Sequence, residues 1–190
     1  MCKQCTTNSD CGNLGTCNSN NTCTCRPQTS GNKIGNAGFN SGGLSPWTGG
    51  SGTTLVTGED ADWCPAGKAL LIADGANGVS QCFAIGAGVT YYMGLQSKNA
   101  SNANGGVKCA LWYFDTADCS GGGAHQLVGH GQVFARNTGT DWSGASAAMG
   151  KFTTSPMTAG ARLDCYSNAA EGGGQALIDD VFVNIGGYNY

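Results

Sequence analysis

Residues 88–98 read GVTYYMGLQSK, and this stretch carries the alternation from which the fold is predicted. Its apolar side chains recur at every second position, at Val89, Tyr91, Met93 and Leu95. Since successive side chains of a β-strand point to opposite faces of a sheet, these four residues are expected to share one buried face. The stretch therefore predicts a half-buried strand.

The same alternation recurs along the chain between glycine-rich turns. Residues 107–113 place Val107, Cys109, Leu111 and Tyr113 on one predicted face. No window of about ten residues holds a convincing helical period, so almost no helix is expected. Many short strands bounded by turns predict an all-β chain folded as a β-sandwich. The other runs expected to form strands are 69–73, 79–85, 132–135, 151–154 and 161–166.

A further run near the end of the chain, ALIDDVFVNI at 176–185, also alternates and contains an aspartate within its apolar pattern. Strict alternation puts Asp179 on the same face as Leu177, Val181 and Val183, and turns Asp180 to the other face. A carboxylate aimed at the core needs hydrogen-bond donors, an arginine or a cation. Asp179 is therefore predicted to have such a partner.

The composition excludes several classes of protein. The chain has 190 residues, a formal net charge of −3 and only nine lysine and arginine residues. Without a basic stripe to neutralise phosphates, nucleic acid is not an expected partner. The longest apolar runs fall far short of the roughly 20 residues that a membrane-spanning helix needs. A chain of this length suits one domain with a good core and a small appendage.

The eleven cysteines indicate an oxidising compartment, because a reducing cytosol would keep them as thiols unless metals held them. We therefore expect an extracellular protein, secreted or at the cell surface. Since the number is odd, at least one cysteine is expected to be free, modified or bonded to another chain.

Cysteines are densest in residues 2–25, which hold six of them and only one large aliphatic residue, Leu14. Hydrophobic burial cannot hold such a segment in one shape, so cross-links are expected to do so. Its spacing resembles small EGF-like or knottin-like modules, with the connectivity left open. The alternatives are a zinc site built from the first and last cysteine pairs, and a clamp or spacer without a ligand. The predicted disulfide cysteines are Cys2, Cys5, Cys11, Cys17, Cys23 and Cys25.

The stretch RPQTSGNK at 26–33 has the proline, serine and glycine content of a linker. The predicted organisation is a cysteine-rich disulfide module at 1–27, a linker at 28–35 and a β-sandwich domain at 36–190.

Four stretches, read in chain order, resemble a known group of domains. They are NAGFNSGGLSPWTGG at 36–50, GVTYYMGLQSK at 88–98, DWSGASAAMGKFTTSP at 141–156 and ALIDDVFV at 176–183. Together they look like the jelly-roll carbohydrate-binding modules of families 4, 9 and 22, over residues 36–185. The resemblance implies a jelly roll and a carbohydrate or cell-surface glycan as partner. It also implies core positions for Phe39, Trp47 and Trp142.

The resemblance further implies a structural calcium ion. In those modules an acid after the opening Asn-x-Gly-Phe motif and an aspartate of the last strand help to hold it. The corresponding residues here are Asn40 and Asp179. Calcium accepts amide as well as carboxylate oxygen, so these two residues are predicted to bind it, with less charge than in the family. The alternative is that backbone N–H groups satisfy Asp179.

Five cysteines follow the front segment. Cys109 and Cys119 flank a strand and a turn, and a bridge between them is the leading prediction. Alternation turns Cys165 inward and Cys82 outward, which disfavours a bond between those two. Cys64 is a further candidate.

Sugars stack their flat C–H faces on aromatic rings, while amide and carboxyl side chains bind their hydroxyls. Exposed aromatic residues near such side chains are therefore the feature to seek. The alternative is that these residues face another sheet, a subunit or the front module. The predicted ligand-binding residues are Trp63, Tyr92, Gln96, Trp112 and Tyr166.

No motif for nucleophilic catalysis is present, and His125 and His130 lack the glutamate of a zinc-protease helix. The sequence thus favours a secreted, non-catalytic glycan-binding protein. The alternative is a structural subunit of an extracellular filament, coat or adhesive layer that self-associates. A glycoside hydrolase is the distant alternative, with its acids drawn from Glu59, Asp60, Asp62, Asp115 and Asp118.

Overall fold

The computed structural model is an all-β chain. It describes residues 5–7, 16–21, 23–24, 31–61, 67–73, 78–100, 105–121, 123, 125–137, 140–143, 149–167 and 174–186. None of the described residues belongs to a helix long and apolar enough to cross a membrane.

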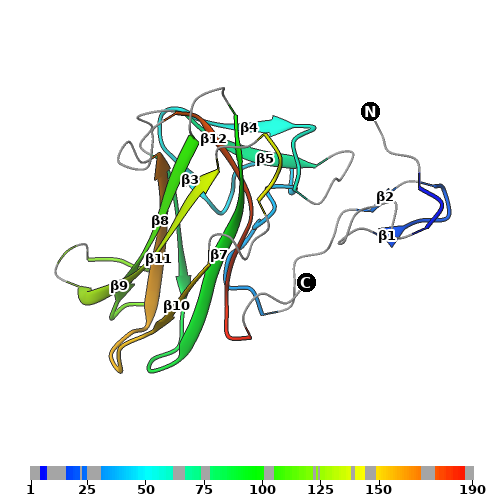
Figure 1. The fold of residues 1–190 in the computed structure, drawn as a ribbon. Coiled ribbons are helices and arrows are strands. Elements are labelled where there is room, and N and C mark those ends of the chain that lie inside the picture. Colours follow the sequence, from blue (N-terminus) through cyan, green and yellow to red (C-terminus); the bar gives the residue numbers. More distant parts are fainter. Residues whose placement is uncertain are drawn as a thin grey trace.

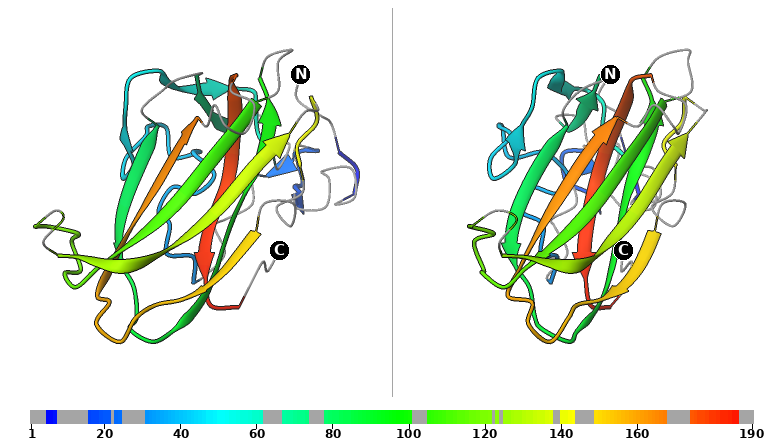
Figure 2. Two further views of the ribbon diagram at one scale, coloured as in Figure 1. Left: turned by 60° about the vertical axis from the view of Figure 1, so that its left-hand side comes forward. Right: turned by 90° about the vertical axis from the view of Figure 1, so that its left-hand side faces the viewer.

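Two five-stranded antiparallel sheets stack as the layers of a sandwich (Figures 1 and 2). Sheet I has the order β3-β6-β11-β8-β9, and sheet II the order β10-β7-β12-β5-β4. In both sheets most neighbouring strands are distant in sequence, as in a jelly roll. This confirms the predicted fold class. The strands of sheet I are β3 (Thr48–Gly49), β6 (Val79–Ala84), β11 (Gly160–Ser167), β8 (Gly105–Phe114) and β9 (Gln126–Asn137). Those of sheet II are β10 (Met149–Thr153), β7 (Thr90–Asn99), β12 (Ala176–Asn184), β5 (Lys68–Ile72) and β4 (Thr53–Thr57).

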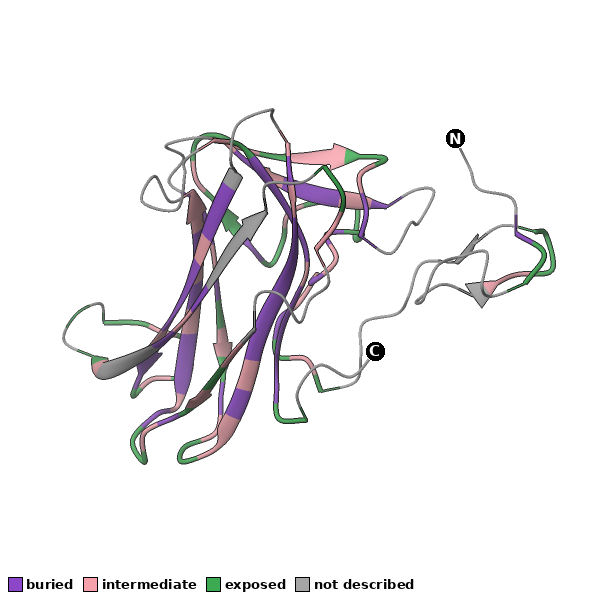
Figure 3. Cartoon of the chain, viewed as in Figure 1, coloured by how far each residue is buried: buried purple, intermediate pink, exposed green. Residues whose placement is uncertain are grey.

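The core lies between the two sheets, where Figure 3 shows buried positions along the central strands. The predicted inward faces of β7 and β8 are confirmed, since Tyr91, Met93, Leu111 and Tyr113 all belong to this core. Phe39 and Trp47 are also buried there, with ring centroids 5.6 Å apart, as the family resemblance implied.

The predicted parity of β12 is wrong in its first half. The register shifts between Asp179 and Phe182, where Asp180 has a φ of 47° and one extra residue forms a β-bulge. Ile178 before the bulge and Val181 after it both face the core. Asp179 pairs with Gln96 and therefore points to the outer side of sheet II.

After the bulge, residues 32–33 take the place of β5 beside β12. The Lys33 N–H donates to Val183 O at 2.8 Å, and the Asn32 amide bridges Val181 O and the Val183 N–H at 3.0 Å. Gln81 holds the next turn by bonding both the N–H and the carbonyl of Gly35. Residues 32–35 are thereby bonded into the sandwich.

The front segment contains β1 (Thr16–Cys17) and β2 (Cys23–Thr24), which pair as a small antiparallel sheet. A disulfide joins Cys5 to Cys17, so Cys5 is not available to the alternative zinc site. Cys2, Cys11 and Cys25 lie outside the described residues, and the bonding of Cys23 stays a prediction.

The predicted Cys109–Cys119 bridge is wrong. Cys109 of β8 lies directly opposite Cys165 of β11, with both side chains in the core, and the two form a disulfide. Cys119 is bonded instead to Cys82, which is exposed on β6. The argument against a Cys82–Cys165 bond is confirmed, because the two residues face opposite sides of sheet I. Cys64 lies outside the described residues.

Candidate functional site

The outer faces of the two sheets differ in how far they are covered. On sheet II, Gly94, Gln96, Leu177 and Phe182 are all buried although they point away from the core. On sheet I most outward residues of the central strands keep partial exposure. The open face on which a ligand can lie is therefore the outer face of sheet I.

Two of the predicted binding residues lie on the covered sheet. Gln96 is only 6% exposed, and its amide nitrogen donates to Asp180 Oδ2 at 2.6 Å. Tyr92 is half-buried, and Lys151 Nζ sits 5.8 Å from the centroid of its ring. Gln96 and Tyr92 therefore both lie on the outer side of sheet II, away from the open face of sheet I. Trp63 lies outside the described residues.

The other two predicted residues come together on sheet I. Trp112 of β8 and Tyr166 of β11 point outward from neighbouring strands, and both are half-buried. Between them on β11 lie Arg162 and Asp164, which share the outward face because they alternate with inward Ala161, Leu163 and Cys165. We call the set Trp112, Arg162, Asp164 and Tyr166 the platform.

Arg162 and Asp164 are not among the binding residues predicted from the sequence. The alternation of inward and outward residues from 160 to 166 could have indicated that both side chains point away from the core. The alternation does not predict the register of β11 against β8, which places Arg162 opposite Trp112 and Asp164 opposite Ala110. Ala110 lies between Lys108 and Trp112 on the outward face of β8.

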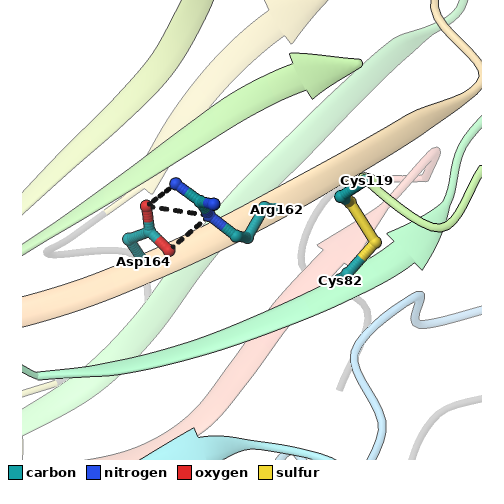
Figure 4. A network of polar contacts seen from close by, with 4 residues as sticks. All are labelled: Cys82, Cys119, Arg162 and Asp164. Carbon is teal, nitrogen blue, oxygen red and sulfur yellow. Dashed lines mark hydrogen bonds and ion pairs between the residues drawn. A yellow bond between two sulfur atoms is a disulfide. The ribbon is translucent and has the colours of Figure 1, made fainter. Parts of the chain in front are cut away.

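The polar centre of the platform is an ion pair (Figure 4). Arg162 Nε donates to both oxygens of Asp164 at 3.0 and 3.2 Å, and Nη2 donates to Oδ2 at 3.1 Å. Trp112 also donates a side-chain hydrogen bond to this carboxylate. The Arg162 guanidinium also lies over the Phe114 ring, 5.6 Å from its centroid.

The environment of Asp164 sets its charge. Burial raises the pKa of this carboxyl, while Arg162 and the Trp112 hydrogen bond act against that rise. The side chain is 23% exposed, against 42% for Arg162. The arrangement leaves a partly desolvated, oriented carboxylate and guanidinium between two aromatic side chains.

A second group of acids lies on the outer side of sheet II, around the bulge of β12. Asp179 is 1% exposed, and its carboxylate accepts from the N–H groups of Ala61 and Asp180, each at 2.8 Å. Burial raises the pKa of Asp179 well above its ordinary value, and the nearby carboxylates of Asp180 and Asp60 raise it further. The backbone donors expected in the alternative to calcium are thus present.

The predicted calcium ligand Asn40 lies at the edge of this group. Its amide nitrogen donates to Asp60 Oδ2 at 3.1 Å, and its oxygen accepts from the Lys68 N–H at 2.7 Å. A Cβ at Gly38 would lie 3.3 Å from Asn40 Nδ2, 3.5 Å from Asp180 Oδ1 and 3.6 Å from Asp179 Oδ1, so an amide nitrogen and two carboxylate oxygens converge there. Carboxylate and amide oxygens are the donor chemistry that calcium prefers. Within the described residues, however, no group of three or more acids, histidines or cysteines is arranged to hold a metal ion.

Two of the acids considered for hydrolysis have partners of their own, and a third, Asp62, lies outside the described residues. Asp115 binds His125 Nδ1 at 2.8 Å, and Glu59 forms an ion pair with Lys98. Trp142, which the resemblance implied to be core, lies half-buried outside it with Lys98 Nζ 5.9 Å from its ring centroid, so that prediction is wrong. The neighbouring Ser143 is bonded to both the N–H and the carbonyl of Ser97 in β7, which holds this segment beside the sheet rather than between the sheets.

No protein-family profile matches the sequence, and no characterised relative matches it. Solved structures do match the fold. The CBM22-1 xylan-binding domain of Paenibacillus barcinonensis Xyn10C aligns with a TM-score of 0.53 at 16% identity, over 80% of this chain and 94% of that one. TmCBM61, solved with β-1,4-galactotriose, aligns with a TM-score of 0.51 at 20% identity, over 81% and 98%.

Larger proteins also contain a similar domain. The CBM22-1-GH10 modules of the Clostridium thermocellum xylanase 10B, solved with xylohexaose, align with a TM-score of 0.57 at 13% identity over 83% of this chain. The active domain of the tailspike protein 4 of bacteriophage CBA120 gives 0.57 at 15% identity over 89% of this chain. The chain spans only 29% and 23% of these two proteins. These likenesses establish the carbohydrate-binding-module type of jelly roll as the fold.

Proposed function

We propose that the protein binds glycan on the outer face of sheet I, with the platform as its contact surface. The main observation behind this proposal is that Trp112 and Tyr166 flank the Arg162–Asp164 ion pair on the open face of sheet I. The solved modules of the same fold support the proposal, since their names state xylan binding or a bound galactotriose.

The chemistry of the platform suits a sugar chain. Aromatic rings offer apolar surface for the C–H faces of pyranose rings, and oriented charged groups bind hydroxyls more strongly than neutral ones. Because the ion pair already fixes both side chains, little rotamer freedom is lost when they bind a ligand. A prepared polar centre between aromatic residues is the usual design of a small-molecule site.

The proposed role is non-catalytic and extracellular. The disulfides support an oxidising compartment, which is where polysaccharides of cell surfaces are found. Asp164, the half-buried acid of the platform, is paired with Arg162, which is a binding arrangement rather than a pair of acids for hydrolysis.

The direct test is binding of the intact protein to a glycan array and to soluble xylohexaose and β-1,4-galactotriose, followed by Trp112→Ala. Loss of a half-buried aromatic contact in a binding site should weaken binding by about 2 kcal/mol, or roughly 30-fold. Tyr92→Ala is the matched control, since Tyr92 is a half-buried aromatic residue of the other sheet. If Trp112→Ala binds glycan as well as the wild type does, or if only Tyr92→Ala loses affinity, the binding site does not lie on sheet I. Ordered polymers under negative stain together with no glycan binding would favour the structural-subunit alternative.

We also propose that calcium stabilises the bulge of β12, with Asp179 and Asn40 as ligands and the carboxylates of Asp60 and Asp180 beside them. The support is the two carboxylate oxygens near Gly38 and the mutual repulsion of the three acids, which a cation would relieve. For Asn40 to bind the ion, its amide oxygen would have to leave the Lys68 N–H and take the place that the amide nitrogen has beside Gly38.

A further inference from the structure

The loop between β8 and β9 lies over the end of the platform strand. A Cβ placed on Gly160 would run into Thr116 O and would lie 3.1 Å from Ala117 Cα. The Cβ position of Gly160 points outward, like Arg162, because the two residues are two positions apart on β11. Thr116 and Ala117 therefore cross the outer face of sheet I at the start of β11, next to Arg162. We call residues Thr116–Cys119 the strap.

The strap is attached covalently on its far side. Cys119 is bonded to Cys82 on β6, and Cys82 is the backbone partner of Arg162 on the other side from Trp112. Figure 4 shows this disulfide beside the Arg162–Asp164 pair. The strap thus leaves β8, passes over β11 and ends on β6, so that it spans three neighbouring strands.

The strap has a defined shape of its own. The Cys119 N–H donates to Thr116 O at 3.3 Å, and the Ser120 N–H donates to Asp118 Oδ1 at 3.1 Å. Cys119 has a φ of 54°, a left-handed conformation that a non-glycine residue keeps only when its surroundings hold it. Because the turn is exposed and carries few apolar side chains, packing contributes little to its position. The disulfide is the strongest constraint that keeps it on the sheet.

We propose that the strap is a positioning element of the glycan site: it blocks the platform at the Gly160 end and confines the ligand to the surface from Arg162 to Tyr166. This inference rests on the proposed function. The confined length is about 13 Å, from four residues at roughly 3.3 Å each. Cys82 and Cys119 act through the strap and do not touch the ligand.

The test compares two variants that release the strap by different means. Cys82→Ser/Cys119→Ser removes the covalent link, and Gly160→Ala keeps the link but fills the space under Thr116. Gly43→Ala is the control for the glycine change, since a Cβ there meets nothing within 4 Å. Cys5→Ser/Cys17→Ser is the control for the loss of a disulfide. Each protein is measured by hydrogen exchange of residues 115–121 and by titration with the glycans that the wild type binds on the array.

Both strap variants are expected to speed hydrogen exchange in residues 115–121 while exchange in β8 and β11 stays slow. Both should weaken glycan binding about three- to tenfold, the cost of ordering a freed segment on binding, and both controls should leave binding unchanged. If the wild type binds glycan and both strap variants bind it equally well, the strap is not part of the site, although the proposed function stands. If the wild type binds no glycan, the proposed function fails. Unchanged exchange in residues 115–121 of the disulfide variant would overturn the role of the bond whatever the binding result.

Discussion

Arg162 and Asp164 lie two residues apart on the outward face of β11, and the guanidinium holds both oxygens of the carboxylate at 3.0 to 3.2 Å. A pair between residues i and i+2 of one strand is possible only because both side chains leave the sheet on the same side. Exposed ion pairs contribute little to stability. The value of this pair lies in fixing two polar groups beside Trp112 and Tyr166.

Replacing Tyr166 should weaken glycan binding without unfolding the protein. Tyr166→Ala removes half-buried apolar surface from the opposite end of the platform to the strap, and a loss of about 1–2 kcal/mol in binding is expected. Isothermal titration gives the affinity, and Tyr166→Phe separates the ring from its hydroxyl. Full affinity in Tyr166→Ala would remove this residue from the site.

Asp164→Asn should disturb the platform more than its small change in shape suggests. The variant keeps a hydrogen-bonding side chain but leaves the Arg162 guanidinium without its counter-charge, so binding should weaken roughly tenfold. Because burial raises the pKa of Asp164, wild-type binding should also weaken on acidification before an ordinary aspartate becomes protonated. Asp164→Asn should lack that step. A pH profile shared by both proteins would contradict this assignment.

The buried acid Asp179 predicts an unusual pH dependence of stability in the absence of calcium. Its pKa is raised in the fold, so the folded state keeps a proton that the unfolded state loses as the pH rises above about 4. Stability in EDTA should therefore fall as the pH rises from that point toward the raised pKa. Asp179→Asn should lack this fall and equal or exceed the wild type at neutral pH.

Calcium should make the wild type more stable than Asp179→Asn at neutral pH. Added Ca²⁺ should raise the melting temperature of the wild type at pH 7 and leave that of Asp179→Asn unchanged. Asn40→Asp, which restores an acid at the position after Phe39, should bind the ion more tightly than the wild type. No calcium response in either the wild type or Asn40→Asp would mean that backbone N–H groups and the amides of Asn40 and Gln96 hold the cluster without an ion.

The two disulfides of sheet I should differ in their effect on stability. Cys109→Ala/Cys165→Ala removes a buried cross-link between β8 and β11 that closes a sequence separation of 56 residues, and should lower the free energy of unfolding by about 2–5 kcal/mol. Cys82→Ala/Cys119→Ala should cost less, because it frees an exposed turn. Urea unfolding measures both. Equal losses would mean that the exposed bond also holds the sandwich together.

The amino-acid sequence by itself determined the class of the fold. The alternation in residues 88–98 and 107–113 reflects a sheet with one face in the core, and that requirement is local to each strand. The inward direction of Cys165 and the outward direction of Cys82 followed from the same rule, as did the outward direction of Trp112 and Tyr166.

Only the tertiary structure decided which outward residues meet. The pairing of Cys109 with Cys165 depends on the register of β8 against β11, and the direction of Asp179 depends on one extra residue in the bulge of β12. The separation of Tyr92 and Gln96 from Trp112 and Tyr166 depends on which sheet each strand joins. Register and sheet order are set by contacts between segments far apart in the chain, so no periodicity within one strand can reveal them.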